Sequence, residues 1–441
     1  MTTDSTAEEA KLPAAGTRGK AGAALLLFAL ALLPLLLSVV LLGYTGRDDS
    51  HITYHVADAL AEGRGIVNYS GEAVEQSSSL LFTGILAAAG AASGLPAAEL
   101  GYYASLGFYL LLLGLLAAAF RREAVPPAYA ALAALCAPAL YWALSGMENS
   151  LYLLELCLLV YLLAKQAAGA DRRLPLAIFG LAAAMTLTRP EAPFVLLCGA
   201  ALLCLLLRFD RRALAALGAI LLAIAAALAL RLACGLEVFP NTVHAKQALG
   251  ILPRIFGGLA YLSRTLSGLP LSSALAFLML TAVTFALVRN TLSPFHRALC
   301  LAGLAFTLTI GAFSVASGGD WMEAGRFFVP AYFLLIALCL AISPRRWRAP
   351  LAAVFAFASL YDIAATAKAG YGGIPLFARY EAAAVNYAPS SFEFRNVIHA
   401  RDVTFVDRTL GVLAEDPRPT AAIGSIQAGM VPYYLFRESG K

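Results

Sequence analysis

Residues Gly46 to Gly65, GRDDSHITYHVADALAEGRG, follow directly after the first long apolar run of the chain, Gly22 to Gly43. About 20 apolar residues are enough to cross a bilayer as a helix, and this run has that length. It is too long for the core of a signal peptide, so we expect it to stay as a membrane anchor. The adjacent acids Asp48 and Asp49 then lie at a membrane surface.

The composition excludes an ordinary soluble protein. The chain has 441 residues, of which 60% are hydrophobic and 13% charged, and its mean hydropathy is +0.76. The net charge of +5 comes from Lys and Arg clusters between apolar runs, so it reports membrane topology and predicts no nucleic-acid partner. The seven cysteines lie in or beside apolar runs without a CxxC spacing, which is typical of small core residues.

The apolar runs predict an all-α polytopic membrane protein with about eleven spanning helices. The predicted spans are Gly22–Gly43, Tyr102–Phe120, Ala128–Leu144, Leu151–Leu163, Leu174–Leu187, Pro193–Leu207, Ala213–Ala233, Leu271–Val288, Ala298–Val315, Phe327–Ile342 and Leu351–Ala365.

A twelfth candidate, Leu80–Leu95, is weakly apolar and rich in Gly and Ala. If it were a span, every later helix would cross the membrane in the opposite direction. With eleven spans and a cytoplasmic N-terminus, most of the Lys and Arg at the helix junctions lie inside, as the positive-inside rule requires. We therefore expect Leu80–Leu95 to be an interfacial or re-entrant helix on the outer face.

This threading divides the chain into three parts. Residues 1–21 form a cytoplasmic tail, and residues 22–366 form a transmembrane domain whose first outer loop spans 44–101. Residues 367–441 have an ordinary soluble composition and lie outside. Ala421–Ile426 and Met430–Phe436 have the pattern of two short strands, so this segment is expected to be a small α/β subdomain.

The outer-face junctions hold nearly all the acids and amides near the membrane. Asp48 and Asp49 have the chemistry of a general base for an acceptor hydroxyl, or of oxygen ligands for Mg²⁺ or Mn²⁺. With equal weight, they simply cap a helix over Ser50–Glu62.

Two acids share one predicted helix. Glu148 opens it, where the helix dipole favours an acid, and Glu155 lies seven residues on, on the same face and deep in an apolar span. A buried acid needs a partner or a water-filled cavity. A cavity that opens to the outer surface would explain both residues.

Other outer-face residues also carry two interpretations. Arg189 and Glu191, around Pro190, form a pair that locks a turn, or Arg189 holds a phosphate with its planar fork. Asn241 caps a helix, or, with equal weight, His244 and Lys246 in the same loop bind an anion.

The loop at 318–326 combines two glycines with Asp320, Trp321 and Arg326. Trp321 alone is typical of the aromatic belt at a membrane interface. An acid, an indole and a cation together are typical of sugar and phosphate recognition. The polar patches therefore place any chemistry on the outer face.

Five of these stretches together resemble the bacterial arabinofuranosyltransferases, membrane glycosyltransferases of the GT-C fold. The group includes the mycobacterial terminal arabinofuranosyltransferases and the pilin arabinosyltransferases. The resemblance runs from about Gly43 to Pro330, with an echo at GSIQAGMVPYY. The stretches are DDSHITYHVADALAEGRGIVNYSGEAVEQSSS from Asp48, SGMENS from Ser145, LTRPEAP from Leu187, PNTVHAK from Pro240 and GGDWMEAGRFFVPAYF from Gly318.

The resemblance implies transfer of D-arabinofuranose from a polyprenyl-phosphate donor of the decaprenyl-phosphate type to a hydroxyl of a cell-envelope glycan or pilin. The reaction would occur on the outer, periplasmic face of the bacterial inner membrane, and a divalent metal remains an open question. It implies that Asp48 or Asp49 is catalytic, and that the donor phosphate lies among Arg189, His244, Lys246 and Arg326. The implied sugar- or acceptor-binding residues are His51, Tyr54, Glu75, Glu148, Glu191, Asn241, Asp320 and Trp321.

Two alternatives remain. The same fold would serve a mannosyl, glucosyl or aminoarabinosyl transferase, since the residues point to arabinofuranose by resemblance alone. A lipid or sugar transporter would place polar groups near the bilayer midplane, with repeat symmetry. Glu155 is the one deep acid in the sequence and no internal repeat is visible, so the transferase interpretation is favoured.

Overall fold

A computed structural model describes residues 48–122, 130, 133, 136–169, 173–241, 243, 251–320, 322 and 324–371. These residues are mainly helical, and no strand occurs among them. The helices are α2 (Asp48–Ala61), α3 (Leu80–Ser93), α4 (Ala97–Arg122), α6 (Ala137–Ala143), α7 (Asn149–Ala167), α8 (Leu174–Thr188), α9 (Ala192–Leu206), α10 (Arg211–Ala233), α12 (Ile251–Gly268), α13 (Pro270–Val288), α14 (Pro294–Ala316), the 3₁₀ helix η1 (Arg326–Phe328), α15 (Val329–Ile342) and α16 (Arg345–Tyr371).

Among the described residues, five helices are long and apolar enough to cross a membrane: α4, α7, α10, α13 and α14. Shorter apolar helices stand beside them at Leu80–Ser93, Leu174–Thr188, Ala192–Leu206 and Arg326–Ile342. The prediction of an all-α membrane protein is therefore confirmed. The first predicted span, Gly22–Gly43, lies outside the described residues. The same holds for all of the predicted outer subdomain (367–441) except residues 367–371, which continue α16.

Capping residues explain where several of these helices begin. Asp210 accepts a hydrogen bond from the Arg212 amide at the start of α10, and Ser293 does the same for the His296 amide at the start of α14. Pro270 and Pro294 occupy first helical positions, where a missing N–H costs nothing. Polar junctions thus separate the apolar runs where the sequence predicts them.

Small residues let the helices of the bundle approach closely. A Cβ added to Gly199 in α9 would lie 2.8 Å from the Phe306 ring in α14, and one added to Gly303 would lie 2.5 Å from Leu338 in α15. Membrane helices associate through such van der Waals contacts, because lipid tails provide no hydrophobic drive between them. α7 contributes to both large apolar clusters and lies at the centre of the bundle.

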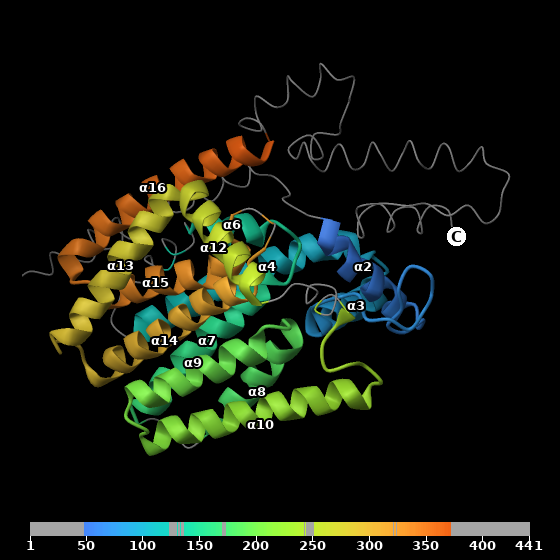
Figure 1. The fold of residues 1–441 in the computed structure, drawn as a ribbon, viewed down its shortest axis with the longest axis horizontal. Helices are drawn as coiled ribbons and strands as arrows, with labels where there is room; N and C mark the ends of the chain where they lie inside the picture. The colour runs from blue at the N-terminus through green and yellow to red at the C-terminus, as the bar shows by residue number, and fades with distance from the viewer. Residues whose placement is uncertain are drawn as a thin grey trace, which may run out of the picture.

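α2 and α3 lie together at one end of the bundle (Figure 1). Tyr54, Phe82 and Leu86 form a small separate core there, which Leu151 of α7 joins. α3 has 14 residues, fewer than a perpendicular crossing requires. α8, α9 and α15 are about as short, so the interfacial or re-entrant placement of α3 stays a prediction.

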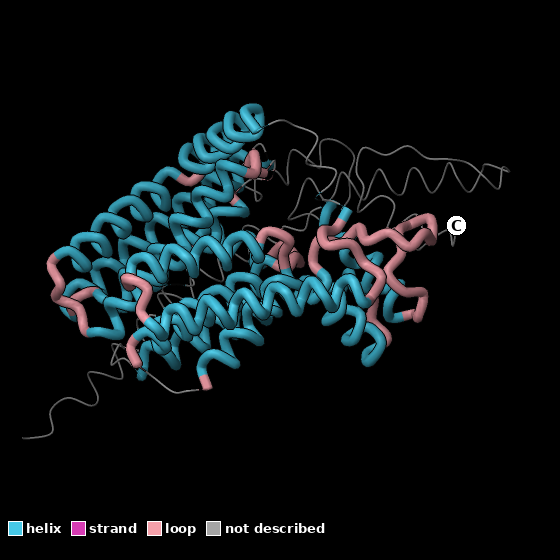
Figure 2. Tube along the Cα trace, turned by 60° about the horizontal axis from the view of Figure 1, so that its bottom comes forward, coloured by secondary structure: helices cyan, strands magenta, loops and turns pink. Residues whose placement is uncertain are grey.

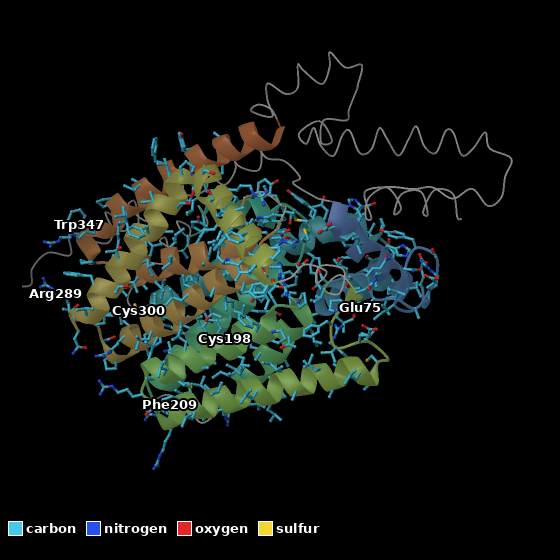
Figure 3. The ribbon with its side chains drawn as sticks, viewed as in Figure 1. Glu75, Cys198, Phe209, Arg289, Cys300 and Trp347 are labelled. Atoms are coloured by element: carbon cyan, nitrogen blue, oxygen red, sulfur yellow. The ribbon has the colours of Figure 1, made fainter. Side chains whose placement is uncertain are left out.

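The two ends of the bundle differ in their residues. Figure 2 shows that loops gather at these ends. Phe209, Arg289 and Trp347, which mark three junctions rich in arginine, lie at the end opposite Glu75 (Figure 3). The charge pattern read from the sequence therefore corresponds to two opposite ends of the described helices.

Candidate functional site

The turn between α6 and α7 is attached to α2. Gly146 has a φ of +71°, a conformation that glycine adopts without strain, and its carbonyl accepts a hydrogen bond of 2.9 Å from the Tyr54 hydroxyl. Glu148 then becomes the N-cap residue of α7, but its side chain makes no cap hydrogen bond. The acid turns instead toward Arg189, so the helix dipole alone does not explain its position.

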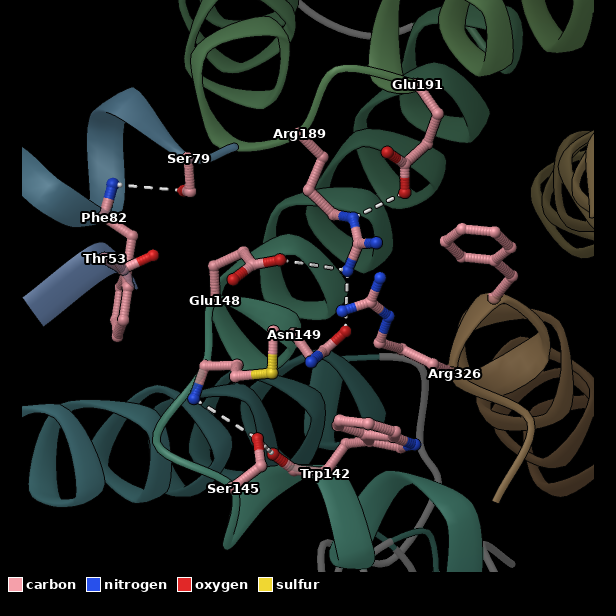
Figure 4. A network of polar contacts seen from close by, with 12 residues as sticks. Thr53, Ser79, Phe82, Trp142, Ser145, Glu148, Asn149, Arg189, Glu191 and Arg326 are labelled. Atoms are coloured by element: carbon pink, nitrogen blue, oxygen red, sulfur yellow. Dashed lines mark hydrogen bonds and ion pairs between the residues drawn. The ribbon is translucent and has the colours of Figure 1, made fainter. Parts of the chain in front are cut away.

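Arg189 is the centre of a buried polar network at the end of α8 (Figure 4). Its Nη1 lies 3.2 Å from Glu148 Oε1 and donates to Asn149 Oδ1 at 2.7 Å. Its Nε donates to Glu191 Oε1 at 2.5 Å. Burial disfavours the charge of Arg189, but Glu191 and Glu148 outweigh this effect and raise its pKa. The Arg–Glu pair that the sequence proposed for this turn is therefore present, with a second acid added.

A second arginine comes from the loop before α15. Arg326 Nε lies 2.7 Å from Asp320 Oδ2, and both side chains are buried. Gly319 has a φ of +74°, and a Cβ on it would lie 2.3 Å from Tyr261 Cβ in α12. The Tyr261 hydroxyl accepts a hydrogen bond of 3.1 Å from the Phe327 amide. α12 thus holds the loop that carries Asp320 and Arg326.

The two arginines meet at one small pocket. It is lined by Asn149, Tyr152, Arg189, Glu191, Arg326, Phe327, Val329 and Pro330, with room for about one water-sized group. The Arg189 and Arg326 guanidinium carbons lie 5.7 and 5.5 Å from the centre of the Phe327 ring. The Arg189 guanidinium also lies 5.6 Å from the centre of the Tyr152 ring. Residues from three separate stretches of the sequence therefore line one space.

The charges of this network are largely matched. Arg189 and Arg326 contribute two cations, and Glu148, Glu191 and Asp320 contribute three carboxylates, so the formal sum is −1. Such a site is suited to a neutral polar ligand more than to an additional anion. The predicted phosphate role of Arg189 and Arg326 would require these carboxylates to give way.

Two further arginines lie beside the same loop. Arg264 of α12 donates to the Asp320 carbonyl at 3.1 Å, and Gly318 packs against Arg254. Neither arginine forms an ion pair with a carboxylate in the described part of the chain. The sequence predicted no binding role for either arginine, because neither stands in a cluster of charged residues.

A separate buried ion pair links Glu75 to Arg231 of α10. Arg231 Nη2 and Nη1 lie 2.5 and 3.0 Å from the two carboxylate oxygens of Glu75, and Arg231 also donates to the Glu237 carbonyl. The backbone amide of Asn241 donates to the backbone carbonyl of Glu75 at 3.3 Å. Burial raises the pKa of Glu75, although Arg231 acts in the opposite direction. Glu75 and Asn241, predicted to bind sugar or acceptor, thus lie together at this ion pair.

The two buried arginine groups border the same turn. Pro190 lines a second small pocket with Arg231, Val238, Phe239 and Pro240, while its neighbours Arg189 and Glu191 line the first. Thr188, one residue earlier, donates to Glu155 Oε1 at 2.9 Å. The partner that the deep acid needs is therefore a hydroxyl next to the arginine network.

Asp48 and Asp49 are the first described residues of α2 and are helical, whereas the sequence predicted a helix from Ser50. The capping interpretation and the catalytic one both remain compatible with this position. His51 and Tyr54 are buried, and their rings lie 5.2 Å apart. No group of His, Cys, Asp or Glu able to hold a metal ion occurs among the residues that the structure describes.

Three predicted residues, His244, Lys246 and Trp321, lie outside the described residues. No family model matches the sequence, and comparison with curated proteins and with solved structures gave no match. The site therefore has to be interpreted from its own chemistry.

Proposed function

We propose that this chain is a membrane glycosyltransferase that moves D-arabinofuranose from a polyprenyl-phosphate donor to a hydroxyl of a cell-envelope glycan or pilin. The observation that carries the proposal is the buried pocket between α7, the α8–α9 turn and η1, where Arg189, Arg326 and Glu191 converge. A charged pocket at the end of an apolar bundle suits a substrate with a polar head and a lipid tail. The arabinofuranose itself rests on the resemblance of the five sequence stretches.

The donor's parts suit different surfaces. The sugar is neutral, and one of its polar groups belongs in the small pocket of the buried network, whose formal charge is −1. The phosphate belongs beside α12, near Arg254 and Arg264, with Lys246 and His244 as further candidates from the preceding segment. The tail belongs against the lipid-facing side of that helix, where Ile251, Leu252, Phe256 and Leu259 are exposed. This assignment moves the phosphate from Arg189 and Arg326 to Arg254 and Arg264, which form no ion pair with a carboxylate in the described part of the chain.

The reaction breaks the bond between the anomeric carbon and a phosphate oxygen, and forms a bond from that carbon to the acceptor oxygen. Asp48 or Asp49 takes the acceptor's proton. The departing polyprenyl phosphate gains negative charge, which nearby arginines stabilise more in the transition state than in the bound donor. Because α2 is attached to the α6–α7 turn through Tyr54 and Gly146, its first turn belongs to the same end of the bundle as the pocket.

The test is transfer by purified protein from synthetic polyprenyl-phosphoryl arabinofuranose to extracted envelope glycan and to pilin, alongside mannosyl, glucosyl and aminoarabinosyl donors. We expect pentose transfer, and a loss of 10²-fold or more in either Asp48→Asn or Asp49→Asn with an unchanged melting temperature. Glu62→Gln changes an exposed acid just after the same helix and should keep full activity. Consumption of another donor would correct the sugar, and consumption of none would favour a transporter.

A further inference from the structure

Two buried polar groups in the pocket lack a partner. Asn149 and Tyr152 are 5% and 4% exposed, and neither Asn149 Nδ2 nor the Tyr152 hydroxyl has a hydrogen-bond partner in the part of the chain that the structure describes. Buried polar groups are nearly always hydrogen-bonded, because an unmade bond is costly. Both residues line the pocket formed by Arg189, Glu191 and Arg326.

Their orientation is fixed by the network around them. Asn149 and Tyr152 are three residues apart on α7 and share one helical face. The Asn149 carbonyl accepts from Arg189, so its amide nitrogen is directed away from that bond (Figure 4). The Tyr152 ring packs against the same guanidinium. Arg189 therefore holds two hydrogen-bond donors in place at one pocket.

The surroundings select the class of ligand. The carboxylates of Glu148, Glu191 and Asp320 outnumber the two arginines, so an anionic group is disfavoured. A neutral hydroxyl accepts hydrogen bonds from an amide and a phenol, and it also donates one to a carboxylate such as Glu191. The pocket has room for about one group of that size.

We propose that Asn149 and Tyr152 bind one hydroxyl or hydroxymethyl group of the donor sugar and thereby determine which sugar is transferred. This proposal rests on the transferase function above and adds two specificity residues to it. A site built to hydrogen-bond a hydroxyl rejects an analogue without it strongly, since its buried polar groups are then left unpaired.

The experiment measures kcat/KM for the intact donor and for the three monodeoxy donors that each lack one sugar hydroxyl. We expect the wild type to lose at least 100-fold with one of these analogues. The kcat/KM of Tyr152→Phe for the intact donor should be at least 10-fold below that of the wild type. For this variant, the same monodeoxy donor should lower kcat/KM by a few-fold at most relative to the intact donor. Such a thermodynamic cycle isolates the contact between side chain and hydroxyl.

Two further variants make the result decisive. Asn149→Asp keeps the oxygen that accepts from Arg189 and removes the amide donor, so it should reduce the same analogue's penalty. Tyr161→Phe is the matched control, because Tyr161 lies on the same helix, its hydroxyl is also buried without a partner among the described residues, and it packs on Phe295 instead. Tyr161→Phe should leave every donor ratio unchanged.

The outcomes separate the two proposals. If the wild type transfers pentose but folded Tyr152→Phe and Asn149→Asp keep the full penalty for every analogue, the specificity proposal is overturned and the transferase function stands. If the wild type uses no sugar donor, the transferase function fails and the specificity proposal fails with it. If it uses another sugar, the monodeoxy analogues of that sugar give the same test.

Discussion

Two buried arginines at the same end of the bundle, Arg231 and Arg189, differ in how their hydrogen bonds and ion pairs are distributed. Arg231 makes two hydrogen bonds to one carboxylate, that of Glu75, and its remaining contacts go to the Glu237 carbonyl. Arg189 divides its contacts among Glu148, Asn149 and Glu191. Both side chains are 6% exposed, so burial does not distinguish them.

The difference lies in what each arginine leaves unsatisfied. The Arg231 group is closed, because a bidentate pair matches the guanidinium fork to one carboxylate. Beside Arg189, the Asn149 amide and the Tyr152 hydroxyl remain without partners in the described part of the chain. A closed ion pair stabilises a fold, whereas an open network next to a pocket provides a binding site. We therefore assign a structural role to the first and a functional role to the second.

The largest effect is expected at the closed pair. Arg231→Leu leaves the Glu75 carboxylate buried without its partner, so the protein should lose about 3–5 kcal/mol of folding free energy and its activity with it. The double variant Glu75→Leu with Arg231→Leu removes both charges and should recover most of the stability. Melting temperatures in detergent and transfer assays measure both effects.

A double substitution at Arg189 and Glu191 tests whether this group differs from the Glu75–Arg231 pair in function. Arg189→Leu combined with Glu191→Leu should recover some stability but no transfer, because the ligand contacts are gone. Recovered transfer in this double variant, or lost transfer in a stable Glu75→Leu, Arg231→Leu protein, would reverse the two assignments.

Arg189→Lys is expected to have a large effect on activity and a small one on stability. Lysine keeps the charge but lacks the planar fork that reaches Glu148, Asn149 and Glu191 together. Transfer should fall by about 10²-fold, equivalent to about 2.7 kcal/mol of transition-state stabilisation, while the melting temperature changes little. Arg208→Lys, at the opposite junction beside Phe209, is the matched control. Equal activity in the two lysine variants would show that Arg189 contributes charge alone.

The sequence predicted the membrane class, several apolar helices and the Arg189–Glu191 pair, because apolar runs and neighbouring charges are local signals. It missed the pairing of Glu75 with Arg231, which are 156 residues apart, since nothing local shows which acid meets which arginine. Arg231 near a helix end was a signal that a buried partner exists. The sequence gave no sign of the roles that we propose for Asn149 and Tyr152. Those roles rest on side-chain atoms that are buried without a hydrogen-bond partner among the described residues, which only the structure shows.

Tyr261→Phe tests whether α12 positions the open site. The substitution removes the acceptor of the part-buried Phe327 amide, so it should cost about 1 kcal/mol of folding free energy. The Phe327 ring contacts both guanidinium groups. The folded Tyr261→Phe protein should therefore transfer sugar several-fold more slowly than the folded wild type. Tyr332→Phe is the control, since it removes a hydrogen bond to Ser273 away from the pocket. Similar transfer by the two folded variants would exclude a positioning role for Tyr261.

The smallest effect is expected at His55, a buried group of α2 whose pKa burial lowers below 6.5. Arg64 acts in the same direction, whereas Asp58 and Glu62 act against it. Below pH 6.5 the unfolded chain binds a proton that the folded protein binds more weakly, so the stability from a neutral His55 is complete above 6.5 and is lost as the pH falls through the lower folded value. Over that interval the loss is at most about 1.4 kcal/mol per pH unit. His55→Gln should flatten the decline in melting temperature between pH 7 and 5. An unchanged slope would show that His55 does not cause the decline.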